Sequence, residues 1–366
     1  MKPQVSLEKV LLDFMEHMRQ SGLVPPREII PDGKIHRFSS SGRPRDDAGW
    51  YVFYADPVAP FGYYGDWRGN TPRRWEVELG RELTAEERKR IRSERVRIQS
   101  AVQMEVQEQQ AAAAERAVKV WKLGEPARAD HPYLVRKQVE PVATLRELPL
   151  KHLKELLGYH PHGRGEFLQG RVLLVPVKVG GGLATLEFID EAGTKSALFH
   201  GAKSGGYWAT EALPPAGRVF VAEGVATALS LRMALGVPVA AALSANNFRK
   251  AGEALLKEHP DRELVLMADM GPDGCPPDGA LVAQAHLGCA LLIPSLRFPD
   301  KTDFNDLHVQ HGLEVLRADL EKALASLAGP ADDAVGASSE PGMGRMETKK
   351  EPSLPRHWPY QSWQRE

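Results

Sequence analysis

The chain contains very little cysteine, and this scarcity excludes two kinds of structure. Cys275 and Cys289 are the two cysteines among its 366 residues. They cannot form a disulfide framework, and no CxxC pair is present to bind zinc. The histidines, including His160 and His162, form no recognisable zinc-ligand pattern. We therefore expect a protein of a reducing compartment that holds no zinc.

The sequence also lacks an excess of charge and long apolar runs. Its formal net charge is −1, so a surface for nucleic acid must come from local clusters of basic residues. No apolar run reaches the roughly 18 residues that a membrane-spanning helix needs, and residues 1–19 contain no apolar signal core. These absences favour a soluble, cytoplasmic protein. A helicase-type GxxxxGK[ST] loop is missing as well.

The first part of the chain divides by composition into a small domain and a long helix. Residues 1–80 combine one amphipathic helical stretch with aromatic-rich strands, which predicts a small α+β domain. We expect most of its aromatic rings to form a core and a minority to be exposed for stacking on bases. Residues 84–124 open with the capping box Thr84–Glu87 and have no glycine or proline before Gly124, which predicts one long charged helix.

The second part of the chain changes from strands to alternating strands and helices. Residues 126–215 contain two apolar strands around a glycine turn, which is typical of a β-meander. From 216 to 328, short apolar runs alternate with helical stretches, a pattern that predicts a parallel sheet covered by helices on both faces. Residues 329–366 are rich in glycine, proline, serine and charge, which is typical of a disordered tail.

Two acidic residues follow predicted strands of this parallel sheet. Glu223 comes directly after the strand 219–222, and Asp269 directly after the strand 264–268. Ligands of open α/β sheets bind beyond the carboxyl ends of the strands, so we expect both side chains in one crevice. Carboxylates gathered there repel one another unless a divalent cation neutralises them, and oxygen ligands suit Mg²⁺ or Mn²⁺.

Several segments resemble the toprim fold, which is shared by bacterial-type primases, type IA and type II topoisomerases and some nucleases. The resemblance is carried by VAEGVATA at 221–228, AALSANNF at 241–248, TDFNDL at 302–307 and the strand region 171–195. These segments occur in the expected order within 126–327, and they are most similar to primase-like proteins of plasmids and phages. The resemblance implies an α/β fold with a Rossmann-like parallel sheet of toprim type and an adjoining β-rich subdomain.

One position departs from the toprim pattern, which continues as Asp-x-Asp after the third strand. Here Asp269 is followed by Met270 and Gly271, so the second acid is missing. Either Asp273, on the following loop, rebuilds the site, or catalysis is weakened or lost and the domain remains as a binding module. The resemblance also places Asp303 and Asp306 at the metal, and the segment can cap the following helix at the same time, with Thr302 or Asp303 as N-cap.

The resemblance implies a primase-like nucleotidyltransferase that makes short RNA primers on single-stranded DNA in plasmid or phage replication. Glu223 and Asp269 would be its catalytic, metal-binding residues, with Mg²⁺ or Mn²⁺ as cofactor and nucleoside triphosphates as substrates. Arg171, Lys195 and Lys203 are expected to contact nucleotide and template. Two alternatives remain open: a non-catalytic accessory protein that binds single strands, and a toprim nuclease.

Overall fold

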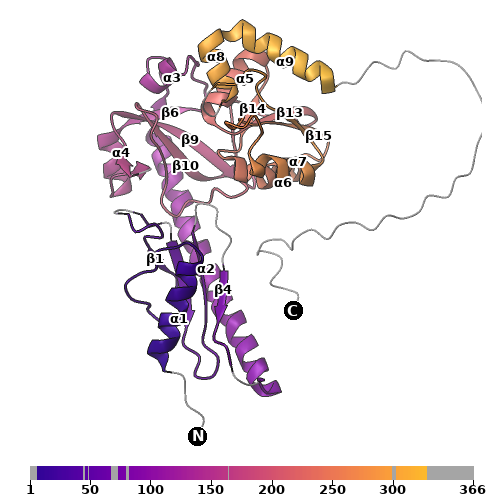
Figure 1. Ribbon diagram of the computed structural model, residues 1–366. Coiled ribbons are helices and arrows are strands. Elements are labelled where there is room, and N and C mark those ends of the chain that lie inside the picture. The colour runs from indigo at the N-terminus through magenta and orange to yellow at the C-terminus, as the bar shows by residue number, and fades with distance from the viewer. Residues whose placement is uncertain are drawn as a thin grey trace, which may run out of the picture.

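The structure is a computed structural model, and it describes residues 6–43, 46–47, 49–66, 73–79, 82–163, 165–298 and 302–327. The tail predicted at 329–366 lies outside the described residues. A small N-terminal module and a larger body are joined by one long helix (Figure 1). None of the helices in the described ranges combines the length and apolar character that crossing a membrane requires.

The N-terminal module is an antiparallel sheet with one helix on each face. Its elements are α1 (Leu7–Gln20), β1 (His36–Phe38), β2 (Gly49–Tyr54), β3 (Phe61–Asp66) and β4 (Arg73–Glu76), and the strands pair in sequence order.

The sheet of this module is covered on both faces because its aromatic side chains alternate between them. Val10, Phe14 and Met18 of α1, spaced four residues apart, are buried against one face. Phe14 comes so near β3 that a Cβ atom at Gly62 would lie 2.7 Å from its ring. The opposite face packs on Ile98 of the long helix. The expectation that most rings form the core is thus confirmed.

The long helix α2 (Ala85–Leu123) is the predicted charged helix. The capping box is present: the Glu87 N–H donates to Thr84 Oγ1 at 3.2 Å, and the Thr84 N–H donates to the Glu87 carboxylate at 2.9 Å. The first half of α2 packs on the N-terminal sheet, while Ala113, Ala117 and Val120 pack on the larger body. One helix therefore contributes to both cores, which fixes the direction in which the chain enters the larger body.

The middle module is a five-stranded sheet with the order β11-β10-β9-β6-β5. It is built on the long hairpin of β9 (Arg171–Val179) and β10 (Gly182–Asp190), the predicted meander. Its other elements are β5 (Glu125–Pro126), α3 (Pro132–Arg136), β6 (Arg146–Pro149), α4 (Leu150–Leu157), β7 (His162–Gly163), β8 (Glu166–Phe167) and β11 (Lys195–Ala197).

The C-terminal sheet has the order β12-β14-β13-β15-β16, and all its strands are parallel except the antiparallel edge strand β12. The elements are β12 (Trp208–Ala209), β13 (Gly217–Ala222), α5 (Val225–Leu235), β14 (Val239–Ala241), a 3-10 turn (Ala245–Asn247), α6 (Phe248–Glu258), β15 (Arg262–Met267), α7 (Asp278–Leu287), β16 (Ala290–Leu292), α8 (Phe304–His311) and α9 (Leu313–Leu327). The predicted α/β class, with a parallel sheet beside a β-rich part, is confirmed.

Two strands of this sheet are shorter than the apolar runs that predicted them. β14 begins at Val239 because Pro238 has no N–H to give to a ladder, and the positive φ of Leu243, 66°, prevents its extension. β16 ends at Leu292, shortly before Pro294, which likewise has no N–H to give to a ladder. The sheets of the larger body meet where Lys178 and Tyr207 form an antiparallel bridge.

Candidate functional site

Two carboxylates follow neighbouring central strands at the same edge of the C-terminal sheet. Glu223 comes directly after β13, and Asp269 follows β15 after one residue. The two strands are parallel and in register, with Ala222 opposite Met267. The helix after β13, α5, packs on one face of the sheet, and α7, after β15, packs on the other. The winding of the chain reverses between these strands, and ligands of open α/β sheets bind at such a point.

A short antiparallel bridge brings a third carboxylate to this edge. The Met270 N–H donates to the Thr302 carbonyl at 2.7 Å, and the Thr302 N–H donates to the Met270 carbonyl at 2.9 Å. Antiparallel pairing then sets Asp269 opposite Asp303, in the kind of pair whose Cα atoms are ideally about 4.5 Å apart. Asp269 is only 6% exposed. The register of this bridge thus sets residues 269 and 303, two of the predicted site acids, at opposing positions.

Asp303 and Asp306 cap helix α8 at the same time. Asp303 Oδ1 accepts from the Asp306 N–H at 2.8 Å, and Asp306 Oδ2 accepts from the Asp303 N–H at 3.0 Å. Burial, followed by repulsion from Asp306, raises the pKa of Asp303. An acid in this position is held in its ionised form more easily when a cation is nearby. Lys137 Nζ lies 3.6 Å from Asp306 Oδ1 and is one such cation.

The missing second acid leaves a space that another carboxylate fills. A Cβ atom placed on Gly271 would lie 2.8 Å from Oδ1 of Asp273. The same Oδ1 accepts from the Cys275 N–H at 3.0 Å, which holds the side chain over Gly271. The loop is folded back on itself, because the Gly271 N–H donates to the Cys275 carbonyl at 2.8 Å. Asp273 therefore lies where a side chain at position 271 would begin.

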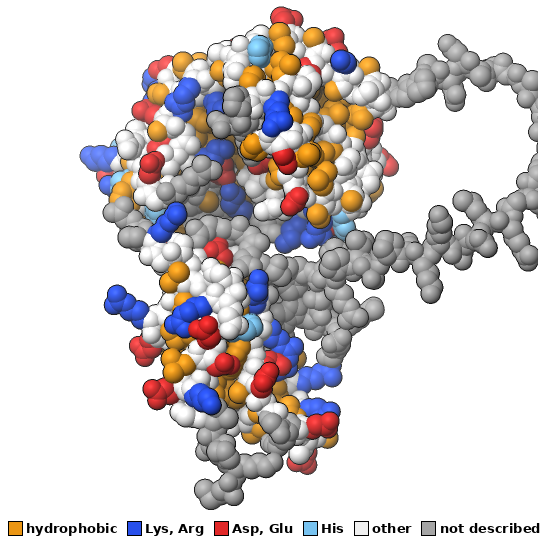
Figure 2. Space-filling model, viewed as in Figure 1, with side chains coloured by type: hydrophobic (Ala, Val, Ile, Leu, Met, Phe, Trp, Pro, Cys, Tyr) orange, Lys and Arg blue, Asp and Glu red, His pale blue; other side chains and the backbone are white. Residues whose placement is uncertain are grey.

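Two of the predicted basic residues belong to the middle module, one near this edge of the sheet and one in an ion pair. Lys195 Nζ lies beside the backbone that follows Glu223, since a Cβ atom on Gly224 would lie 3.9 Å from it. Lys203 Nζ lies 2.5 Å from Glu187 Oε2, a carboxylate that is only 4% exposed. Blue side chains also gather over the boundary between the halves of the larger body (Figure 2).

Arg171, the third predicted basic contact, is already surrounded by carboxylates. Its guanidinium lies 2.8 Å from Asp130 Oδ1, 3.3 Å from Glu147 Oε1 and 3.2 Å from Glu191 Oε1. Hydrogen bonding to Asp130 raises the pKa of Arg171 above its ordinary value. A phosphate would have to displace at least one of these acids to reach the guanidinium.

Within the described ranges, no three His, Cys, Asp or Glu side chains are arranged as a ready-made metal site. A site for Mg²⁺ does not require one, because this ion keeps several waters and is commonly bound by one or two carboxylates together with substrate phosphates. Glu223, Asp269 and Asp303 provide oxygen donors at one edge, which is the donor chemistry that Mg²⁺ and Mn²⁺ take.

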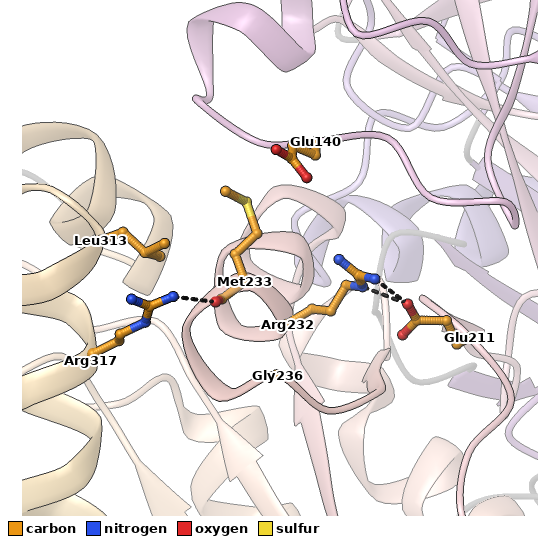
Figure 3. A pocket seen from close by; sticks show the side chains of 7 residues that line it. All are labelled: Glu140, Glu211, Arg232, Met233, Gly236, Leu313 and Arg317. Atoms are coloured by element: carbon orange, nitrogen blue, oxygen red, sulfur yellow. Dashed lines mark hydrogen bonds and ion pairs between the residues drawn. The ribbon is translucent and has the colours of Figure 1, made fainter.

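A cavity of about 330 Å³ lies at the other end of α5, away from these acids. Figure 3 shows how its charged residues are engaged: Arg232 pairs with Glu211 at 2.5 Å, and Arg317 donates to the Met233 carbonyl at 3.4 Å. Gly236, which ends α5, also lines it. Because it lies at the amino ends of the strands, this cavity is not the expected ligand site of the sheet.

Comparisons with known proteins give a matching family and several similar proteins. The family described as Toprim domain matches residues 218–314, the segment that contains Glu223, Asp269 and Asp303. In sequence, the chain is 28% identical over 264 residues to DNA primase TraC of Escherichia coli, covering 70% of this chain and 23% of that protein. Residues 218–314 thus match the toprim family, and most of the chain is similar in sequence to a DNA primase. The chain spans about a quarter of the length of this relative.

Solved structures of primases are also similar to this chain. The primase fragment of the bacteriophage T7 primase-helicase protein is 14% identical, with a TM-score of 0.33, over 46% of this chain and 70% of that one. A DnaG primase catalytic domain bound to ssDNA is 12% identical, with a TM-score of 0.41, over 60% of this chain and 83% of that one.

Sequence reasoning missed two side chains that organise the site. Glu187 lies at a buried position of the apolar strand β10. A single charged residue in an apolar run is the sequence signal that could have identified it. Asn305 is fully buried and donates to the Lys137 carbonyl at 2.7 Å and to Ser230 Oγ at 2.9 Å. It ties α8, and with it Asp303, to helices α3 and α5.

Proposed function

We propose that this chain is a DNA primase that joins ribonucleotides into short primers on single-stranded DNA. The observation that carries the proposal is the placement of Glu223, Asp269 and Asp303 at the point where the winding of the toprim sheet reverses. Similarity to DNA primase TraC supports the same activity. We further propose that the chain works in the cytoplasm, in the replication of a plasmid or phage.

Glu223 and Asp269 are the proposed catalytic residues, and they would hold Mg²⁺ or Mn²⁺ together with Asp303. Asp306 and Asp273 are the further candidates for this role, the first through its bonding to Asp303 and the second through its place over the Gly271 backbone. A divalent ion, when bound here, neutralises phosphate charge and orients the groups of an in-line displacement.

The proposed role of the basic residues is to position phosphates. Lys195 is the best placed, because its ammonium lies beside the Gly224 backbone that follows Glu223. Lys203 would contact the template or nucleotide by exchanging its bond with Glu187 for one with a phosphate. Arg171 would do so only by releasing one of its three acids. A separate helicase would supply the unwound strand, since the chain has no GxxxxGK[ST] loop.

The test is primer synthesis by the whole chain on single-stranded DNA, with ribonucleoside triphosphates and Mg²⁺ or Mn²⁺. Glu223→Gln and Asp269→Asn remove charge with little change of shape, and each should lower the rate about 100-fold or more, since even an outer partner of a metal site is worth 10- to 100-fold. Glu263→Gln is the matched control, because its side chain is 61% exposed at the far end of β15. Synthesis that survives in both site variants contradicts the proposal.

A second candidate function is a non-catalytic protein that binds single strands. Gly271 is the observation that favours it, because the second acid of the toprim pattern is absent there. This candidate predicts that the wild-type chain binds single-stranded DNA but never extends a primer with either metal. In that case the substitutions at Glu223 and Asp269 leave DNA binding unchanged.

A further inference from the structure

A tight turn of the middle module displays two rings at its tip. The turn follows β11 and runs from Leu198 to Gly201, closed by the Gly201 N–H donating to the Leu198 carbonyl at 3.0 Å. His200 has a φ of 62°, a backbone region that residues other than glycine seldom adopt. Phe199 and His200 therefore occupy the two corner positions, and we name this pair the turn tip.

The turn is held rigidly by its surroundings. Leu198 is buried, and its N–H donates to the Leu186 carbonyl at 3.0 Å. Gly201 packs so closely on β10 that a Cβ atom there would lie 1.8 Å from Thr185 Oγ1. The Phe199 N–H donates to the Tyr159 hydroxyl at 3.0 Å. The rings are thus presented by a fixed backbone and not by a loose loop.

The turn tip remains exposed although its backbone is fixed. The Phe199 side chain is 46% exposed. Its ring lies edge-on to His200, with centroids 4.3 Å apart, and edge-on to Tyr159 at 6.2 Å. The ring is thus about half exposed, and neither of these two neighbouring rings is stacked on it. A single exposed apolar residue is ordinary on a protein surface. Whether Phe199 could bind a ligand therefore depends on the charged residues around it.

Two arginines from other parts of the chain are close enough to act on the turn tip electrostatically. Burial, then the nearby charges of Arg37 and Arg116, lowers the pKa of His200, while Asp47 acts in the opposite sense. Arg37 is on β1 of the N-terminal module, and Arg116 is on α2, next to Ala117 in the core that also holds Tyr159. Both arginine side chains are exposed. The surroundings of the tip are therefore basic, with one acid among two arginines.

We propose that the turn tip, with Arg116 and Arg37, is a stacking site for an unpaired base of single-stranded nucleic acid. Sequence-tolerant binding of single strands combines aromatic rings that stack on bases with cations that contact the phosphates, and this surface offers both. Lys203, one of the proposed phosphate contacts, lies two residues beyond Gly201 in the sequence. The inference takes its class of ligand from the proposed function, but it concerns a different surface.

Binding of the full chain to a fluorescein-labelled oligo(dT), followed by anisotropy, tests the proposal. The oligomer should be longer than the roughly 4–16 nucleotides that one binding unit covers. Phe199→Ala should weaken binding about tenfold, the loss expected for one stacked base, whereas Phe199→Tyr should bind like the wild type. Leu281→Ala is the matched control, because this side chain on α7 is 42% exposed and remote from the turn.

Two further arms separate stacking from general damage. An abasic oligomer of the same length should bind weakly to wild type and should not distinguish it from Phe199→Ala. Arg116→Gln should reduce the slope of log affinity against log salt by about 0.7, the value of one phosphate contact with a single strand. Oligo(U) in place of oligo(dT) shows whether the strand that binds here is RNA or DNA.

The proposal is overturned if Phe199→Ala binds oligo(dT) like Leu281→Ala, or if it loses affinity for dT and abasic oligomers alike. An unchanged salt slope in Arg116→Gln removes the arginine from the site. Failure of the proposed function has a different signature: the wild type then binds oligo(dT) through Phe199 and still makes no primers.

Discussion

The space over Gly271 permits a direct test of which acid completes the site. In the structure, Asp273 Oδ1 lies 2.8 Å from the place of a Cβ atom on residue 271, closer than carbon and oxygen approach without a shift. Gly271→Asp alone must therefore move Asp273 and break its bond to the Cys275 N–H. One such hydrogen bond contributes about 0.5–1.5 kcal/mol, so the free energy of unfolding should fall by about 1 kcal/mol.

The double variant Gly271→Asp with Asp273→Ala removes this clash and restores an acid at position 271. If Asp273 completes the site, Asp273→Ala alone should lower primer synthesis about 10- to 100-fold, the range for partners of a metal site. The double variant should recover most of that loss, while Gly271→Asp alone should not exceed the wild type. These rates need measurement over a series of Mg²⁺ concentrations, because a weakened site should require more metal for half-maximal synthesis.

Asp278→Ala is the matched control, since Asp278 belongs to the same connection but begins helix α7. The reasoning is refuted if Asp273→Ala makes primers at the wild-type rate with an unchanged need for metal. It is also refuted if Asp278→Ala is as slow as Asp273→Ala, since both effects would then come from disturbance of the loop.

Three other outcomes follow from the structure. Burial lowers the pKa of His131, whose Nδ1 accepts from the Tyr133 N–H. The contribution of the neutral ring to the free energy of unfolding should therefore be fully present above pH 6.5 and should fall below it, at up to about 1.4 kcal/mol per pH unit. Urea unfolding measured over this pH range should show a flatter profile in His131→Asn. Asn305→Ala should cost about 1–3 kcal/mol, measured by the same unfolding, because it removes two hydrogen bonds, to the part-buried Lys137 carbonyl and to the buried Ser230 hydroxyl. Lys195→Gln should raise KM for nucleoside triphosphates more than it lowers kcat, in steady-state primer synthesis.

The strand ends could be predicted from sequence because the signal is local. A short apolar run followed by Glu223 or Asp269 places each acid at the carboxyl end of a strand, and parallel pairing brings these ends together. The capping box at Thr84 and the extent of α2 were readable for the same reason. Local patterns of this kind need no knowledge of which distant segments meet.

The remaining contacts depend on distant pairing, and no local pattern contains them. The bridge that sets Asp303 opposite Asp269 joins segments about thirty residues apart. The apolar pattern predicts the elements but does not predict this pairing. The acids around Arg171 come from three separate parts of the chain. A basic residue on a strand therefore looks available in the sequence, although in the fold its charge is already balanced.

The candidate site contains residues of two modules, so its geometry depends on how these modules are held together. Glu223 and Asp269 belong to the C-terminal sheet, whereas Lys195 belongs to the middle module. One apolar core includes residues of both modules, and the hydrogen bond from Asn305 to Lys137 crosses between them. Because this hydrogen bond helps to hold the acids and the lysine together, loosening it should move the cation away from the carboxylates. Substitution of Asn305 should then lower activity by more than its effect on stability explains.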